Sequence, residues 1–477
     1  MKKLTTLLLA AGMVFAASAP ASAVDVKMDG EYMFTYGLGE RTAFGGNFDA
    51  AGQRLRLGMT FTASENLSGY MQLQAGISQT ANNGYDWGTD TTGRNSDIAV
   101  RQAYIDWMVP NTDVKVRMGK QLTGLPEDAF GKHAVMHPGW GGRDGISISA
   151  PVTDWLDVTA FWVRSAYNNH EDFAYDTDMS DKSDFFALSA AMKFDGFAIT
   201  PYVMYASIDK STYGAKYNAD EAEWYLAGNG IPGSSDGGYL ADGNAFWAGA
   251  TASLTYFDPF TLKVSGAYGV VSYDGLGDKL ADKTALIPTI NHPNYNDRDG
   301  WYVQAKASYK TAYGTPILGA WYGSGDDRDV QYLRQGWIPT NAGRFHPSFG
   351  LRAGEFGLYD TASLHNIAGT WGVQAGIENV SFLEDLSHKF TVTLWKGTNQ
   401  DSALASDTNP TEYMTTSDTA VEFNLASTYK IYKNLTANLE LAYILADFDK
   451  DDHYEWADGD DYSENGWSAM LSFAYKF

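Results

Sequence analysis

The residue types that most often perform bond chemistry are scarce in this chain and poorly placed for it. There is no cysteine, so the chain has neither a thiol nucleophile nor a disulfide. His133 and His137 have the i, i+4 spacing of a helical zinc site, but no helix is expected there and the glutamate of such a site is absent. Ser363 and His365 are close in sequence, yet a hydrolase also needs a third group that orients the histidine. The sequence therefore predicts that the protein is not an enzyme.

Charged side chains instead recur at a spacing of two residues, which suits an electrostatic role. Arg54 and Arg56 are two residues apart, and so are Lys115 and Arg117. In a β-strand this spacing places both side chains on the same face. Fixed charges that line a water-filled passage select solutes by charge as well as by size. Such selection requires strands that hold these cations on a common wall.

Composition limits the classes of protein that could supply those strands. The chain has 477 residues, of which 34 are basic and 58 acidic, and its net charge of −24 repels nucleic-acid phosphates. With 44% hydrophobic and 19% charged residues it is too apolar for a disordered protein. A mean hydropathy of −0.30 excludes a bundle of membrane helices. The remaining classes are a soluble globular protein and a β-barrel, and no nucleic acid is expected as a partner.

The first 23 residues have the pattern of a cleaved signal peptide. Two lysines precede an apolar run from Leu7 to Ala17, and Ala21-Ser22-Ala23 forms an A-x-A cleavage site. We expect residues 1–23 to be removed and residues 24–477 to form a single barrel domain. No later stretch has about 18 consecutive apolar residues, so any passage through a bilayer must use strands.

Apolar and polar side chains alternate along most of the mature chain. In the final run, Trp467 and Leu471 share one face, while Ser468 and Ser472 share the other. Period two is typical of strands that present one face to lipid and the other to a polar interior. Short turns such as Asp195-Gly196 alternate with long polar connections, which is the pattern of transmembrane barrels.

The alternating runs allow the strands to be counted. The runs begin near Val26, Gln53, Leu67, Asp97, Asp113, Gly145, Trp155, Asp184, Phe197, Asn244, Phe260, Gly300, Gly314, Asn366, His388, Asp418, Leu435 and Trp467. The sequence therefore predicts an all-β fold, a transmembrane antiparallel up-and-down β-barrel of about 18 strands, with 16 strands as the alternative. Short turns are expected on the periplasmic side and long loops on the outer side.

The chain resembles the porins of the Gram-negative outer membrane. Its end, Ser472-Phe473-Ala474-Tyr475-Lys476-Phe477, is similar to the terminal strand of that family, which implies that Phe477 is a signal for the barrel-assembly machinery. The stretches VDVKMDG (24–30), RQAYIDW (101–107) and VRMG (116–119) resemble the homotrimeric porins of sulfate-reducing bacteria. The resemblance implies a homotrimer in the outer membrane that contacts the bilayer and lipopolysaccharide. It also implies passive diffusion of small hydrophilic solutes and ions through a water-filled channel.

The resemblance further implies that the third loop, residues 121–144, folds into the lumen as a pore constriction. Porins often carry a Pro-Glu-Phe-Gly type motif there, and residues 125–131 match it with two residues between Glu127 and Phe130. Glu127 and Asp128 are therefore expected to form the acidic side of the constriction. An ordinary solvated surface loop is the alternative.

An acidic loop inside a barrel needs a basic wall opposite it. The candidates for that pore wall are Arg54, Arg56, Lys115, Arg117, Arg143, Arg101 and Lys120. An Arg or Lys on the lipid face costs about 2 to 4 kcal/mol at the bilayer midplane. Cations that share a strand face with polar residues are therefore expected to face the lumen. Arg101 and Lys120 share parity with apolar neighbours, which also fits the barrel rim. Opposed charges would create a transverse field that orients dipolar solutes.

Two outer loops are strongly acidic, namely His170 to Asp184 and Asp447 to Glu464. Asp447, Asp449 and Asp451 have the spacing that opens a calcium loop, but Asp452 stands where an EF-hand needs glycine. Solvated loops are therefore expected. A loop-bound divalent cation is the alternative, and no other cofactor or metal site is predicted.

Two other functions fit the same fold. A substrate-specific 18-stranded channel would bind its solute in the lumen, where Tyr70, Tyr202 and Tyr302 are candidates for an aromatic track. A non-conducting adhesin or structural barrel would act through its outer loops. The sequence leaves the choice between anions and cations open, because basic lumen residues favour anions and acidic loops favour cations.

Overall fold

The structure is a computed structural model of the chain. It describes residues 24–40, 48–75, 98–136, 142–167, 182–208, 243–273, 298–327, 335–340, 345, 347–349, 367–400, 413–449 and 465–477. The predicted signal peptide lies outside the described residues, as do residues 137–141 of the expected constriction loop and most of the two acidic loops. In the described stretches, no helix is long and apolar enough to cross a membrane.

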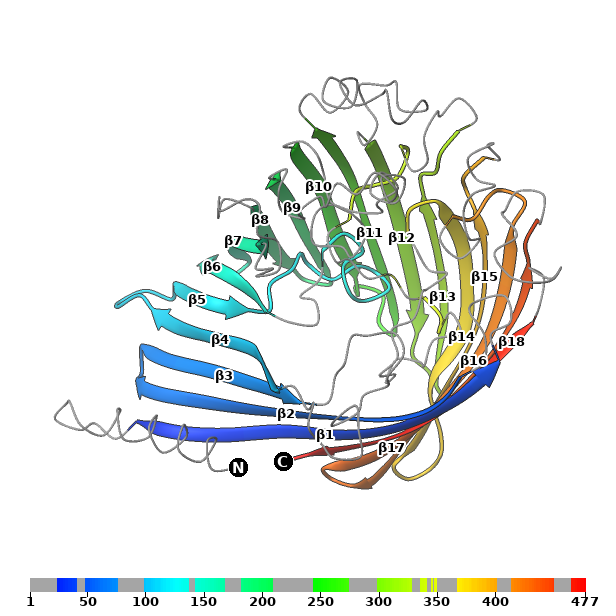
Figure 1. Cartoon of the computed structure of the whole chain (residues 1–477), viewed down its shortest axis with the longest axis horizontal. Coiled ribbons are helices and arrows are strands. Elements are labelled where there is room, and N and C mark those ends of the chain that lie inside the picture. The colour runs from blue at the N-terminus through cyan, green and yellow to red at the C-terminus, as the bar shows by residue number, and fades with distance from the viewer. Residues whose placement is uncertain are drawn as a thin grey trace, which may run out of the picture.

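The described residues form a single antiparallel sheet of 18 strands that closes on itself. In chain order the strands are β1 (Asp25–Glu40), β2 (Phe48–Ser64), β3 (Leu67–Ala75), β4 (Ile98–Met108), β5 (Lys115–Gln121), β6 (Arg143–Thr153), β7 (Leu156–Tyr167), β8 (Lys182–Phe194), β9 (Phe197–Ile208), β10 (Gly243–Leu254), β11 (Phe260–Tyr273), β12 (Arg298–Tyr309), β13 (Thr315–Gly323), β14 (Thr370–Leu383), β15 (Leu386–Gly397), β16 (Thr419–Tyr432), β17 (Leu435–Asp447) and β18 (Gly466–Lys476). Each strand pairs with its neighbours in sequence, and β1 also pairs with β18, which gives an up-and-down barrel (Figure 1). The predicted fold class and the count of 18 strands are confirmed, and the alternative of 16 is wrong.

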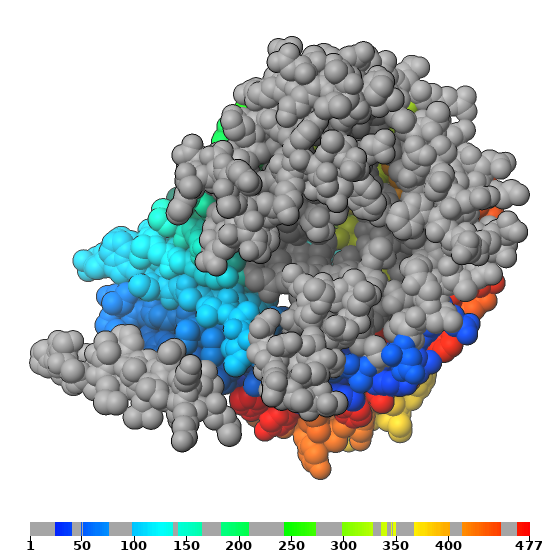
Figure 2. All heavy atoms as spheres, viewed as in Figure 1, coloured from blue at the N-terminus to red at the C-terminus, as the bar shows by residue number. Residues whose placement is uncertain are grey.

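The barrel closes where its first and last strands meet. Glu31 of β1 is in register with Lys476 of β18, and Gly30 and Phe477 exchange two backbone hydrogen bonds of 2.8 and 3.0 Å. In Figure 2 the blue residues of the first strands and the red and orange residues of the last strands lie together at the lower edge. Closure leaves no unpaired strand edge at this seam, as a lipid environment requires.

The strands present apolar side chains outward and polar ones to the lumen, as their alternating pattern predicts. In β17, Leu439 and Leu441 are 39% exposed on the outer wall, whereas Asn438 and Glu440 are 2% and 3% exposed on the inner side. Successive side chains of a strand point to opposite faces, so a single pattern produces both surfaces.

Short connections alternate with long ones around the barrel. The turns Ser64–Leu67, Phe194–Phe197 and Tyr432–Leu435 each place two residues between paired strand ends. Gly196 has a φ of 67°, a left-handed conformation that glycine adopts without steric cost. By contrast, residues 209–242 separate β9 from β10. The predicted alternation of turns and loops is confirmed.

Gly145 of β6 is a position where a side chain does not fit. A Cβ there would lie 2.1 Å from the carbonyl oxygen of Trp162 in the paired strand β7. Gly145→Ala is therefore expected to strain the β6–β7 pair and to destabilise the barrel by about 1–3 kcal/mol. The measurement is the temperature at which the detergent-solubilised barrel unfolds. Gly69→Ala is the control, because its Cβ would lie 3.7 Å from the nearest heavy atom, and equal shifts in the two variants would contradict the prediction.

Candidate functional site in the barrel lumen

The inner face of β2–β5 carries a row of cations. Arg54 and Arg56 of β2 have the inward parity, because Arg54 is in register with the buried Met33 and Arg56 with Gln74. The registers of β3 with β4 and of β4 with β5 place the side chains of Lys115 and Arg117 of β5 on the same inward face. We call these four residues together with Arg101 the basic wall. The parity predicted from the sequence places its β2 and β5 members correctly.

Two members of the basic wall are neutralised by carboxylates of adjacent strands. An Nη of Arg54 lies 2.6 Å from Glu31 of β1, and Arg117 donates two hydrogen bonds of 2.6 and 2.7 Å to Asp106 of β4. The Arg117 guanidinium also lies 3.8 Å from the centre of the Tyr104 ring. These acidic partners belong to the wall itself and not to the loop. Neither Glu31 nor Asp106 was predicted as a site residue from the sequence.

Arg101 reaches the lumen through a β-bulge. The pairing of β3 with β4 shifts by one residue between Gln72 and Leu73, because Gln72 is in register with Gln102 and Leu73 with Val100, and Arg101 lies at this shift. Its Nη1 donates a 2.7 Å hydrogen bond to the inward-facing Gln72 side chain. A bulge redirects a side chain in this way, so Arg101 lies on the pore wall as predicted, and the alternative position at the rim does not apply.

The remaining two candidates for the pore wall lie elsewhere. Lys120 is in register with Ala103 and with Asp144, on the outward parity, so it does not belong to the basic wall. Arg143 points inward but is 8% exposed, and its Nη1 donates a 2.9 Å hydrogen bond to the carbonyl oxygen of Thr123. Arg143 therefore holds the base of the loop that follows β5.

That loop crosses the lumen and packs on the inner face of β9, β11 and β12. The backbone N–H of Ala129 donates to Ser265 of β11 at 2.9 Å, and that of Phe130 donates to Gln304 of β12 at 3.2 Å. In Figure 1 the cyan segment after β5 lies inside the barrel. We call residues 121–136 the constriction loop. Its inward folding agrees with the expectation from the sequence and contradicts the alternative of a surface loop.

Asp128 is the centre of the contact between the constriction loop and the wall. Its side chain is buried, and Oδ2 accepts hydrogen bonds from the Tyr302 hydroxyl at 2.8 Å and from Gln304 Nε2 at 3.2 Å. The backbone N–H of Ala134 donates to the same oxygen at 2.8 Å. One carboxylate thus closes the loop on itself and fastens it to β12.

His133 fastens the loop at a second point. Its Nδ1 accepts a hydrogen bond of 3.0 Å from the backbone N–H of Val135, so Nε2 carries the proton and donates to the Tyr202 hydroxyl at 2.7 Å. The ring is 1% exposed. Burial disfavours the charged form and lowers the pKa of His133, although the carboxylate of Asp128 opposes this effect.

A second segment also folds into the barrel. Trp337 and Ile338 are buried, and Trp247 of β10 donates its indole N–H to the Pro339 carbonyl oxygen at 2.8 Å. Phe345 makes an edge-to-face contact with Phe130 of the constriction loop, with 5.8 Å between the ring centroids. We call residues 335–349, as far as they are described, the inward segment. The lumen is thus narrowed by two pieces of chain that contact each other.

The chain is similar to known proteins in its three-dimensional structure and not in its sequence. No protein-family model and no curated protein matches the chain. Among solved structures it is similar to OpdK of Pseudomonas aeruginosa, solved with vanillate, at 11% identity and a TM-score of 0.54 over 95% of this chain and 98% of that one. It is also similar to OccK2 (OpdF) of the same organism, at 14% identity and a TM-score of 0.55, over 95% and 98% of the two chains. A BenF-like porin of Pseudomonas fluorescens has 10% identity and a TM-score of 0.51, over 95% and 99%.

The chain has the porin fold. The likeness covers 95% of this chain and 98 to 99% of the solved structures.

Within the porin fold the two predicted acidic residues have different positions. Glu127 is exposed, whereas Asp128 is 2% exposed and bonded to β12. Asp128 therefore does not line open space as the sequence analysis expected. Asp128 begins a tight turn, in which the backbone N–H of Gly131 donates to the Asp128 carbonyl oxygen at 3.0 Å, and its side chain is turned to β12.

The wall residues that contact the constriction loop were not predicted from the sequence to do so. Tyr202 and Tyr302 were considered for an aromatic track, but they are 3% and 2% exposed and lie beneath the constriction loop. Glycines at strand positions that face the lumen could have indicated where these loops pack. A Cβ at Gly319 would lie 2.5 Å from the Phe130 ring, and one at Gly300 would lie 2.4 Å from the Ile338 nitrogen. Glycines facing the lumen mark the places where chain from elsewhere fills it.

The state of His133 makes the anchoring of the constriction loop sensitive to acid. Below about pH 6.5, the usual pKa of histidine, a His133 released from its site binds a proton that the buried ring does not. The anchored state therefore loses stability as the pH falls through this value toward the lowered pKa of the buried ring. We expect channel currents to become noisier between about pH 7.5 and pH 5.5. His133→Gln should weaken this dependence, and an unchanged dependence in that variant would count against the assignment.

Proposed function

We propose that the chain is an outer-membrane porin that lets small hydrophilic solutes and ions diffuse passively through a water-filled, charged constriction. The observation that carries the proposal is the constriction loop, which packs on β9, β11 and β12 while the basic wall of β2–β5 faces the lumen. A solute that passes the loop meets fixed cations, which attract anions and orient dipoles. Exposed Glu127 supplies the acidic side of the field.

The same proposal includes location and partners. The outer membrane of a Gram-negative bacterium is the location, reached through the periplasm after the signal peptide of residues 1–23 is removed. The outward apolar face contacts lipid and lipopolysaccharide, and a homotrimer like that of the sulfate-reducing bacterial porins buries part of it. Phe477, which is paired with Gly30 at the seam, serves the barrel-assembly machinery. No nucleic-acid partner and no catalytic activity are proposed.

Planar-bilayer recording of the detergent-extracted protein tests the proposal. Large ohmic steps are expected, in groups of three if the trimer forms, and the reversal potential in a salt gradient is expected to show preference for anions because of the basic wall. Absence of steps after verified insertion would refute a diffusion channel. It would favour the non-conducting adhesin or structural barrel, whose function resides in the outer loops.

A substrate-specific channel is the second candidate. The specific observation is similarity to OpdK, which was solved with vanillate, a carboxylate, combined with the cations that line this lumen. Such a channel would show conductance or flux that saturates with one solute. A linear dependence on the concentration of every solute tested would leave the general porin as the better description.

A further inference from the structure

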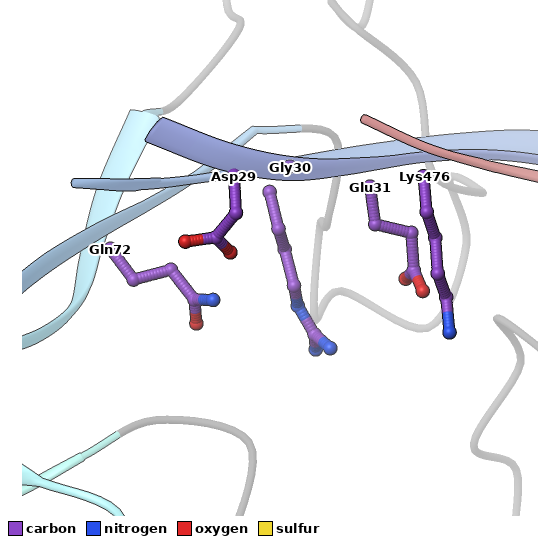
Figure 3. Close-up of a pocket in the computed structure, with 6 residues that line it drawn as sticks. Asp29, Gly30, Glu31, Gln72 and Lys476 are labelled. Carbon is purple, nitrogen blue, oxygen red and sulfur yellow. The ribbon is translucent and has the colours of Figure 1, made fainter. Parts of the chain in front are cut away.

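A charged pocket lies on the inner wall at the seam of the barrel. Its lining combines residues of β1, β2, β3 and β18, namely Asp29, Gly30, Glu31, Arg56, Gln72 and Lys476, and the cavity measures about 230 Å³. Figure 3 shows the side chains of Asp29, Glu31, Gln72 and Lys476 extending to the same side of the strands. Only a closed barrel forms this pocket, because β1 must pair with both β2 and β18.

Most of the charged side chains that line the pocket do not form ion pairs with one another. Glu31 is in register with Arg56 on one side and Lys476 on the other, yet its carboxylate is bonded to Arg54 at 2.6 Å. Arg56 donates its Nε–H to the neutral side chain of Gln74 at 2.7 Å. Within the part of the chain that the structure describes, Asp29, Arg56 and Lys476 make no ion pair. The pocket therefore presents two cations and one carboxylate that are free to bind other charges.

The space beside Asp29 depends on the absence of a side chain at Gly58. A Cβ at Gly58 would lie 2.6 Å from the Tyr70 hydroxyl and 2.8 Å from Oδ1 of Asp29. Gly58 points inward, since it is in register with Asp29 and with Gln72. Glycine here lets the Asp29 carboxylate turn into the pocket without a clash.

We propose that this pocket is a binding subsite for small zwitterionic solutes, of which free α-amino acids are the simplest. The solute carboxylate lies near Arg56 and Lys476, and its ammonium group meets the carboxylate of Asp29. A solute with both charges gains both contacts, whereas a simple anion gains one and leaves the Asp29 carboxylate opposed to it. The subsite rests on the proposed function, because solutes reach the pocket through an open lumen.

The experiment compares four solutes of similar size in planar bilayers: alanine, propionate, alaninamide and glycerol. Binding is read from the current noise or partial block that each solute adds to the open channel in potassium chloride. The wild-type channel is expected to bind alanine saturably and more tightly than the other three. Alanine binding no tighter than propionate binding would overturn the proposal.

Substitutions give the two ends of the solute separate readouts. Asp29→Asn is expected to weaken alanine binding by about fivefold and to strengthen propionate binding, because the carboxylate that opposes the anion is removed. Arg56→Gln and Lys476→Gln are expected to weaken the binding of both solutes. Lys389→Gln is the matched control, because Lys389 is a cation on β15 that lies 3.5 Å from Glu378 and not in this pocket. Equal loss of alanine binding in Asp29→Asn and Lys389→Gln would overturn the assignment.

The proposed function and the subsite fail in different ways. Conductance in potassium chloride alone measures the open channel, and its absence would refute the porin proposal. Binding of radiolabelled alanine to the detergent-solubilised protein then measures the pocket without a bilayer. Gly58→Ala should reduce that binding without any change of charge, because its methyl group occupies the space beside Asp29.

Discussion

Replacing Asp128 by alanine is expected to release the constriction loop and widen the channel. The substitution removes the acceptor of three hydrogen bonds, those donated by Tyr302, Gln304 and the Ala134 backbone. These donors are buried, and each buried polar group left without a partner costs about 1–3 kcal/mol. The loop therefore loses its fixed place on β12, and the channel is expected to conduct more current and to admit larger solutes.

Single-channel conductance and the swelling rate of liposomes in oligosaccharide solutions measure this effect. Glu127→Ala is the matched control, because Glu127 is adjacent in sequence but exposed. It removes a charge from the lumen and leaves the anchor of the loop intact, so it should change ion preference without changing the size limit. A size limit that stays the same in Asp128→Ala would show that the loop is held by other contacts.

Arg56→Glu is expected to move the ion preference of the channel strongly toward cations. Arg56 faces the lumen, and in the described chain its guanidinium donates a hydrogen bond to the neutral Gln74 and none to a carboxylate. A unit charge at about 4 Å contributes about 1 kcal/mol in water, which changes the local ion concentration about fivefold, and the substitution changes two units. The reversal potential in a salt gradient is the measurement.

Two comparisons make the second prediction specific. Lys120→Glu introduces the same change of charge on the outward face, where Lys120 is in register with Ala103, and should leave the reversal potential unchanged. Arg54→Gln should have a smaller effect than Arg56→Gln, because Arg54 is already paired with Glu31 at 2.6 Å. If Lys120→Glu shifted the potential as much as Arg56→Glu, the assignment of inner and outer faces would be wrong.

The strand pattern could be predicted because it depends on neighbouring residues alone. The eighteen runs read from the sequence match the eighteen strands, and β17 shows why, since Asn438 and Glu440 are inward and Leu439 and Leu441 outward as their alternation requires. The inward parity of Arg54, Arg56, Lys115 and Arg117 follows from the same rule.

Parity fails where the chain departs from regular pairing. Arg101 occupies a bulge, and a single extra residue in a strand reverses the face of the side chain. The positions of Asp128 and Glu127 depend on which wall the loop meets, and the loop contacts residues of that wall that lie 69 to 174 positions further along the chain. No local pattern contains this information.

By itself, the sequence determined a closed barrel of about 18 strands, the faces of those strands, and a charged lumen, because alternation and turn residues act over a few positions. Only the tertiary structure decided which charges cancel. It paired Arg54 with Glu31 and Arg117 with Asp106, buried Asp128 under the constriction loop, and left Arg56, Asp29 and Lys476 around one pocket. The physical reason is that ion pairs form over a few ångströms between side chains that strand register and loop folding bring together.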